Sequence, residues 1–138
     1  MQRWLVVMAV TLCLALGGGG QVFAQSAAEK IKAANLRAAQ DYLKSGFILA
    51  GEGRDEEAAK AFGSAVSIRP DWAEARSLYG SALARISKYS EAEAELRKAV
   101  ALKPDYAEGW NFLGEFLKDR GKTAEAQEAF RKAQQYAR

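Results

Sequence analysis

The chain has 138 residues, with 20 Lys plus Arg against 17 Asp plus Glu and a formal charge of +3. This small excess is interleaved with acidic residues, as in EAEAELRK at 91–98, which is typical of a solvated helix face and not of a nucleic-acid surface. There is no histidine, the commonest general base and metal ligand at neutral pH. The single cysteine, Cys13, excludes an intrachain disulfide. We therefore predict no enzyme, no metal or cofactor, and no nucleic-acid partner.

The segment at positions 1–24 has the layout of a secretory signal peptide. Arg3 precedes an apolar run from Leu5 to Leu16, and four glycines follow that we expect to break a helix. The tripeptide VFA at 22–24 places small residues for cleavage after Ala24. The apolar run is shorter than the roughly 20 residues that a helix needs to span a bilayer. We predict a periplasmic or secreted protein with no stable membrane insertion; an uncleaved N-terminal membrane anchor is the alternative.

Residues 25–38 are predicted to form an N-terminal helical extension. Ser26 and Glu29 make a Ser-x-x-Glu capping box, which indicates a helix start, and the helical pattern then continues to about Ala50. Ile31 and Leu36 are the large apolar residues of this segment. A cap for the fold, a dimer seam and a loosely held arm are all compatible with the pattern.

A sequence repeat of fixed period runs through the rest of the chain. RPDWAEAR at 69–76 returns as KPDYAEGW at 103–110, and windows that begin at Ala39, Ala73 and Ala107 agree in several columns. These columns hold a glycine, an alanine, a bulky apolar residue and a second alanine: Gly46, Gly80 and Gly114; Ala58, Ala92 and Ala126; Phe62, Leu96 and Phe130; Ala65, Ala99 and Ala133. The small residues predict two antiparallel helices in close approach, and the bulky column fills the space beside them.

Turn-forming residues divide each window. Gly53 and Gly121 lie where the first helix of a pair is expected to end, and Ser87 stands at the equivalent place in the middle window. Pro70 and Pro104 cannot continue a helix and therefore end each pair. An acidic pattern, Asp-x-x-Glu, follows each proline and predicts a capping box for the next helix. Its members are Asp71 with Glu74 and Asp105 with Glu108.

These features resemble the tetratricopeptide repeat family. The resemblance is strongest in Trp110-x-x-Leu113-Gly114, followed by Ala126 and Phe130, against the family pattern W-x-x-L-G-x-x-Y…A…F…P. It covers residues 39–138 as three repeats, at 39–72, 73–106 and 107–138. It implies an all-α fold, an α-solenoid of antiparallel helix pairs wound into a right-handed superhelix.

Three columns depart from the family pattern. Tyr42 and Arg76 stand where the family has Trp, and Ser45 and Tyr79 stand before the glycine where it has Leu. A leucine replaces the family's later Tyr in all three windows, at Leu49, Leu83 and Leu117. These departures weaken single repeats but leave the three-window period intact.

The resemblance also implies a concave groove, lined by the first helix of each pair, in which relatives bind peptides or protein segments. Mapping by window gives the candidate partner-binding residues Leu43, Phe47 and Ala50; Ser77, Ser81 and Arg85; and Asn111, Glu115 and Lys118, with Gln40, Glu74, Glu108 and Asp119 beside them. The first third of this set is apolar and the last third is charged. The basic and amide pair of the family's carboxylate-clamping members would fall at Leu43 and Phe47, so no such clamp is expected.

We therefore predict an exported protein–protein interaction module, an adaptor or scaffold that binds a peptide or helix of a partner in this groove. The alternative is a self-associating structural component of an envelope assembly, a homo-oligomer whose groove is filled by its own extension or a second copy. One column reads Val66, Val100 and Gln134, and its polar last member is expected where a repeat array ends. Trp72 and Tyr106 are expected to pack between repeats and not to contact a ligand.

Overall fold

The structure is a computed structural model that describes the backbone of residues 2–137 and the side chains of residues 19–137. In this range the chain forms helices and no strand, which confirms the predicted all-α fold. The helices are α1 (Gln2–Gly51), α2 (Asp55–Ile68), α3 (Ala73–Arg85), α4 (Tyr89–Leu102), α5 (Ala107–Asp119) and α6 (Thr123–Tyr136). Contacts divide the chain into two units, Met1–Leu36 and Arg37–Arg138, each described by itself below.

Two predictions about the first unit are wrong. α1 continues through the four glycines at 17–20 and through Ser26, without a break at the first or a start at the second. Glycine costs a helix only about 1 kcal/mol relative to alanine, so a glycine run weakens a helix without forbidding it. Ser26 lies in the helix interior, where the backbone N–H already has an acceptor and needs no cap.

The predicted boundaries of the signal peptide, after residue 24, and of the helical extension, after residue 38, both lie inside α1. No change of secondary structure marks either one, and both stay predictions. The side chains of the apolar run at 5–16, with Cys13 among them, lie outside the described residues. Within the part of the chain that the structure describes, no helix is apolar over a stretch long enough to cross a bilayer.

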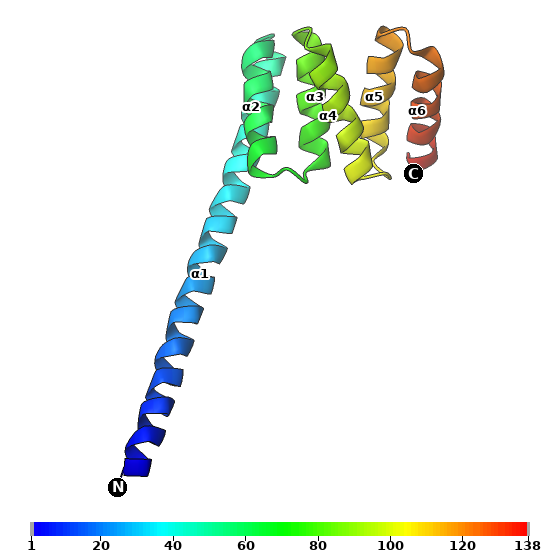
Figure 1. The fold of residues 1–138 in the computed structure, drawn as a ribbon. Coiled ribbons are helices and arrows are strands. Elements are labelled where there is room, and N and C mark those ends of the chain that lie inside the picture. The colour runs from blue at the N-terminus through cyan, green and yellow to red at the C-terminus, as the bar shows by residue number, and fades with distance from the viewer. Residues whose placement is uncertain (1, 138) are drawn as a thin grey trace. The chain divides into compact units, whose positions relative to one another are not determined.

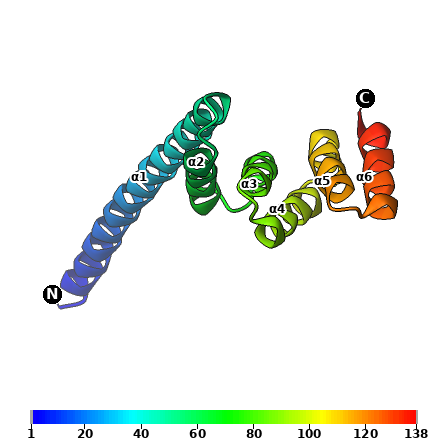
Figure 2. The ribbon, with the colours of Figure 1, turned by 90° about the horizontal axis from the view of Figure 1, so that it is seen from above.

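In the second unit, α2 to α6 lie side by side in chain order (Figures 1 and 2). The helices of each pair approach closely at the glycine column, as predicted. A Cβ atom added at Gly46 would lie 2.5 Å from the ring of Phe62, and one added at Gly80 would lie 2.8 Å from Cγ of Leu96. The alanines of the facing helices are buried at every repeat: Ala58, Ala92 and Ala126, then Ala65, Ala99 and Ala133.

Each pair turns at a residue in the left-handed conformation. Gly53, Ser87 and Gly121 have φ of 77°, 64° and 73°, as expected where the first helix of a pair ends. The N–H of the next residue then bonds to a carbonyl earlier in the helix. These bonds run from Arg54 to Leu49 (2.9 Å), Lys88 to Leu83 (2.9 Å) and Lys122 to Leu117 (2.8 Å). This closure satisfies a carbonyl at the helix end, and the second helix begins directly after it.

The predicted capping boxes do not form. α3 begins at Ala73, and its N-cap, Trp72, makes no side-chain cap hydrogen bond. Asp71 is instead the third residue of a turn that is closed by the Trp72 N–H donating to the Arg69 carbonyl at 3.2 Å. Proline suits the second position of such a turn, so Pro70 and Asp71 build the turn, and Asp71 lies one residue before the N-cap, too early to cap the helix. The turn before α5 repeats this geometry with Tyr106 as the N-cap.

The core consists mostly of alanines and leucines, with a few phenylalanines and valines. Its largest cluster joins α3 to α6 and includes Leu83, Leu96, Leu113 and Leu117. A smaller cluster at the first junction contains Ala65, Val66 and Ala75, and Trp72 packs against it. The packing role predicted for Trp72 is therefore confirmed, while Val66 and Val100 are buried and Gln134 is exposed.

Candidate functional site

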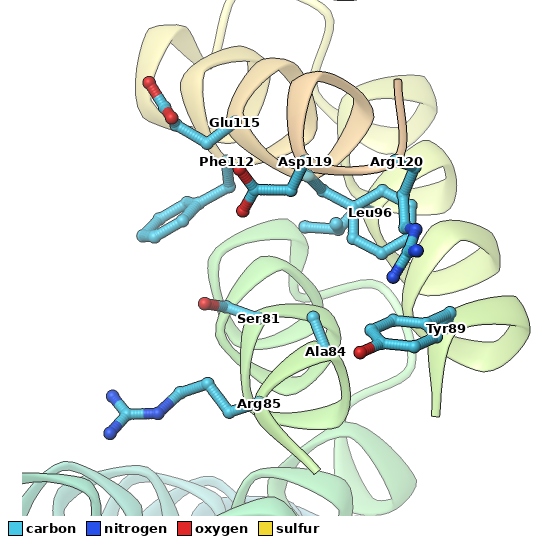
Figure 3. Close-up of a pocket in the computed structure, with 10 residues that line it drawn as sticks. Ser81, Ala84, Arg85, Tyr89, Leu96, Phe112, Glu115, Asp119 and Arg120 are labelled. Carbon is cyan, nitrogen blue, oxygen red and sulfur yellow. The ribbon is translucent and has the colours of Figure 1, made fainter. Parts of the chain in front are cut away.

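A pocket of about 440 Å³ lies among α3, α4 and α5 (Figure 3). Its floor is apolar and consists of Ala84 on α3, Leu96 on α4, and Phe112 and Phe116 on α5. Polar side chains surround this floor: Ser81, Arg85, Tyr89, Glu115, Asp119 and Arg120. Two arginines face two acids, so the lining has no net formal charge. We call this site the α3–α5 pocket.

Tyr89 and Arg120 form the wall of the pocket beside α4. Cζ of Arg120 lies 3.9 Å from the centre of the Tyr89 ring, a cation–π contact that Figure 3 shows. The Tyr89 hydroxyl donates a hydrogen bond to Oγ of Ser87 at 3.3 Å. A hydrogen bond that the Ser87 hydroxyl donates to the phenolate form, and then the Arg120 guanidinium, lower the pKa of Tyr89 below its ordinary value. Both side chains are thus held in place while remaining exposed to solvent.

The charged side chains Arg85 and Glu115 on the opposite wall each have an ion-pair partner. Nε of Arg85 lies 2.8 Å from Oδ1 of Asp55, an ion pair without the alignment of a hydrogen bond. Nζ of Lys118 lies 3.4 Å from Oε2 of Glu115, and both of these side chains are largely exposed. Exposed ion pairs contribute only about 0–1 kcal/mol. Glu115 can therefore exchange Lys118 for a group of a bound peptide at little cost. Arg85 keeps Asp55, whose Oδ1 is buried, but its side chain is 53% exposed and can pair with a further group of the peptide.

The pocket brings together several of the residues that the sequence predicts. Ser81, Arg85 and Glu115 line it, with Asp119 from the wider mapping. The other two predicted residues of α5, Asn111 and Lys118, are exposed but lie outside the pocket lining.

The prediction for Ser77 is wrong. Ser77 is fully buried, and its hydroxyl donates to the backbone oxygen of Ala73 at 2.9 Å. Ser77 also acts to lower the pKa of Tyr106 at the next repeat junction, although burial raises that pKa overall. Ser77 is therefore part of the packing between repeats and has no surface to offer a partner.

The first repeat presents one large exposed side chain among its predicted residues. Leu43 and Ala50 are half-buried and pack against the cluster that contains Phe62. Phe47 is 52% exposed, with its ring edge-on to that of Phe62 at a centroid distance of 5.6 Å. Its neighbour Ile48 is similarly exposed.

Sequence reasoning missed Tyr89, Phe112 and Arg120. The mapping considered only residues on the expected groove side of each first helix. Tyr89 begins a second helix, and Arg120 follows the end of α5. Phe112 had a usable signal, since it is a large aromatic residue directly after the mapped Asn111. The Tyr89–Arg120 contact joins two different columns of the repeat, and no single column indicates it.

Two family models match the chain, both described as tetratricopeptide repeat, at residues 49–115 and 107–138. The chain carries tetratricopeptide repeats. No curated protein matches it. Within the described residues of these repeats and the segment before them, no group of three or more His, Cys, Asp or Glu side chains is placed to hold a metal ion.

Solved tetratricopeptide repeat structures share this fold. The second TPR of Spaghetti (RPAP3), bound to the HSP90 peptide SRMEEVD, has a TM-score of 0.71 and 21% identity, over 78% of this chain and 98% of that one. The Arabidopsis OM64 TPR domain has a TM-score of 0.70 and 17% identity, over 74% and 84%. The crystal structure of MamA has a TM-score of 0.66 and 27% identity, over 78% of this chain and 63% of that chain. These likenesses support a helical solenoid of tetratricopeptide repeats.

Proposed function

We propose that the tetratricopeptide repeats form a protein–protein interaction module, an adaptor or scaffold that binds a peptide or helix of a partner protein. The observation that carries this proposal is the α3–α5 pocket, which combines an apolar floor with a charge-balanced polar rim. A volume of about 440 Å³ is in the range of small ligand sites and suits one or two side chains. The RPAP3 domain is bound to an HSP90 peptide in its solved structure, which supports peptide binding on this fold.

The chemistry of the pocket indicates what a bound segment offers. An apolar side chain of the partner would contact Phe112 and Phe116 on the floor. Polar groups on either side of it would pair with Arg85, whose side chain is partly exposed, and with Glu115, whose present ion pair is weak. Phe47, half-exposed on α1, would provide a second apolar contact on the first repeat. In this proposal Leu43 and Ala50 support Phe47 from below, and Asn111 and Lys118 extend the polar end.

We further propose that the module is exported to the periplasm or secreted. The support is the sequence layout of residues 1–24, with residues 25–38 as the extension and 39–138 as the repeats. The mass and N-terminal sequence of the protein purified from its native host test this. Gln25 at the N-terminus supports cleavage, and an intact Met1 in the membrane fraction supports the anchor instead.

Site-specific photo-crosslinking tests partner binding. A photo-reactive residue replaces Glu115 on the pocket rim or Phe47 on α1, and an exposed residue of α6, Gln127, is the matched control. Foreign proteins crosslinked from the first two positions and not from the control support the module. Equal crosslinking from all three positions would remove the pocket as the binding site. Crosslinks only within or between copies would favour the self-associating structural component.

A further inference from the structure

A second groove lies on the surface between α2 and α3, with a volume of about 670 Å³. Its lining includes the apolar residues Val66, Tyr79, Leu83 and Ile86. Charged residues at its border include Glu56, Lys60 and Lys88. It shares no lining residue with the α3–α5 pocket, so it is an independent site. We call it the α2–α3 groove.

The next repeat junction shows how the equivalent place is covered inside the same chain. On α4, Glu93 lies 2.9 Å from Nζ of Lys122, and Arg97 lies 2.5 Å from Oε2 of Glu125. Arg97 also lies 2.8 Å from Oε1 of Glu93, one helical turn earlier on the same helix. One acid and one arginine, a helical turn apart on α4, thus bridge to the start of α6 and the turn before it.

The junction between the first and second repeats has only two of the four charged groups found at the junction between the second and third. One repeat before Lys122 and Glu125, the same columns hold Lys88 and Glu91, so one cation and one anion remain. One repeat before Glu93 and Arg97, the columns hold Ala59 and Gly63, so the bridging side chains are absent. Neither Lys88 nor Glu91 makes an ion pair within residues 19–137.

Tyr79 fills only the bottom of the space that these small residues leave. A Cβ atom at Gly63 would lie 3.2 Å from Cε2 of Tyr79, so the ring lies directly beneath the glycine. The equivalent residue at the second junction is the smaller Leu113. Burial, and then the nearby Glu91 carboxylate, raise the pKa of Tyr79, so its hydroxyl remains a donor at neutral pH. The groove above this ring stays open.

We propose that the α2–α3 groove binds a partner segment that supplies the missing bridge. The segment carries one carboxylate and one guanidinium a helical turn apart, with an aliphatic side chain beside them. Its carboxylate pairs with Lys88, its guanidinium pairs with Glu91, and its aliphatic side chain contacts Leu83 and Ile86. Two arguments favour this kind of segment. Its charges complement Lys88 and Glu91, and the chain itself provides the same groups at the second junction.

Direct binding to a synthetic peptide tests the proposal. The probe is a capped, alanine-rich helical peptide whose centre reads Glu-Ala-Ala-Leu-Arg, the spacing of Glu93, Leu96 and Arg97 on α4. The control peptide reads Arg-Ala-Ala-Leu-Glu. Titration calorimetry on the purified full chain is expected to show about tenfold tighter binding of the probe, because the control places like charges together. Equal affinities, or no binding of the probe, overturn the proposal.

Two variants locate the site. Exchange of the two charges that the peptide would pair with, Lys88→Glu with Glu91→Lys, is expected to reverse the preference between the two peptides. Copying the second junction, with Ala59→Glu, Gly63→Arg and Tyr79→Leu, is expected to fill the groove and weaken probe binding about tenfold. If the triple variant fails to fold by circular dichroism, the surface charge exchange alone decides, and an unchanged preference overturns the proposal.

A third variant keeps this site separate from the α3–α5 pocket. Glu115→Gln changes the rim of that pocket and is expected to leave probe affinity unchanged, because Glu115 does not line the α2–α3 groove. A loss of probe binding in this variant would place the peptide in the α3–α5 pocket and overturn the assignment to the groove. Failure of the crosslinking at Glu115 would leave the peptide result standing.

Discussion

Arg76 and Trp110 occupy equivalent positions in the second and third repeats, and they make the same hydrogen bond. Nε of Arg76 donates to the Pro70 carbonyl at 2.7 Å, and Nε1 of Trp110 donates to the Pro104 carbonyl at 2.8 Å. Each bond ties the turn between repeats to the first helix that follows it. Arginine in place of the family's tryptophan therefore keeps the donor and loses only the ring.

Arg76 has a further role, because it also lies 2.5 Å from Oε2 of Glu95, and both side chains are only 14% exposed. We expect Arg76→Met to lower the free energy of unfolding by about 2 kcal/mol, since it leaves Oε2 of a largely buried carboxylate unpaired, while Oε1 keeps only Lys98 at 3.3 Å. Urea denaturation of the two proteins measures this difference. Arg131→Met is the control, since its ion pair with Glu128 is exposed and its loss should cost about 0.5 kcal/mol or less. Equal effects of the two changes would contradict the structural role of Arg76.

At the scale of helices, the distance between the two members of a pair depends on the glycine column. Gly80 is the most constrained of its members, because an added Cβ would lie 2.8 Å from Cγ of Leu96 and 3.0 Å from the backbone oxygen of Ala92. At Gly46 and Gly114 the obstacle is an aromatic ring, Phe62 or Phe130. A ring can rotate to relieve such a contact, whereas a helix backbone must move as a whole.

We therefore expect Gly80→Ala to destabilise the fold by about 1–3 kcal/mol, as overpacking at a close helix contact does. The matched control is Gly51→Ala at the end of α1, where an added Cβ meets no atom within 4 Å. Alanine has the higher helix propensity, so the control should hold stability or raise it slightly. Thermal unfolding followed by circular dichroism compares them. A Gly80→Ala protein as stable as the control would show that α3 and α4 can separate freely.

At the scale of the whole molecule, ion pairs connect one repeat to the next. Glu93 pairs with Lys122 and Arg97 pairs with Glu125, and both pairs connect the second repeat to the third. Within the second repeat, Glu74 at the start of α3 pairs with Lys103, which follows α4. The Lys122 hydrogen bond is the largest influence on Glu93 and holds the pKa of its carboxyl below the ordinary value. For Glu74, burial acts to raise the pKa, but the Lys103 hydrogen bond and other favourable contacts together lower it.

A lowered carboxyl pKa in the folded state means that unfolding takes up protons. The stability that these pairs contribute is complete above the ordinary glutamate pKa, about 4.3, and is lost as pH falls through the lowered folded-state values. We expect the denaturation midpoint to fall with pH below about 4.5. The Glu93→Gln variant should be less stable than the parent protein at pH 7, and its free energy of unfolding should fall less than the parent's on acidification. A variant with the parent's full acid dependence would show that Glu93 does not contribute.

The period of the repeat was enough to predict helix pairs, because each column shows whether a small or a bulky side chain is needed at that point of the helix contact. Gly80 opposite Ala92, with Leu96 beside them, describes a close helix contact without any knowledge of the rest. The start of α3 was not predictable in this way, because Asp-x-x-Glu suits both a cap and a turn. Pro70 decides between the two by forming the turn.

The candidate site was predictable only in part, because pockets depend on side chains from several repeats. Ser81 and Arg85 follow from one face of α3, and Glu115 follows from the equivalent face of α5; the structure places all three in one pocket. Ser77 has the same periodicity but is buried, with Tyr106 of the following junction close by. The period indicates the helix face of a residue, while its exposure depends on the size of its neighbour from the next repeat.

Among the described helices, α3, α4 and α5 each contact helices on more than one side, whereas α6 has its main contacts with α5 alone. The amide hydrogens of α6 are then protected by a single interface. In heavy water they should exchange for deuterium well before those of α3 and α4, and a protease should cut α6 before α3 and α4. Unfolding would begin at α6 and proceed helix by helix toward α2. The α2–α3 groove would therefore remain folded after α5 had detached and the α3–α5 pocket had been lost.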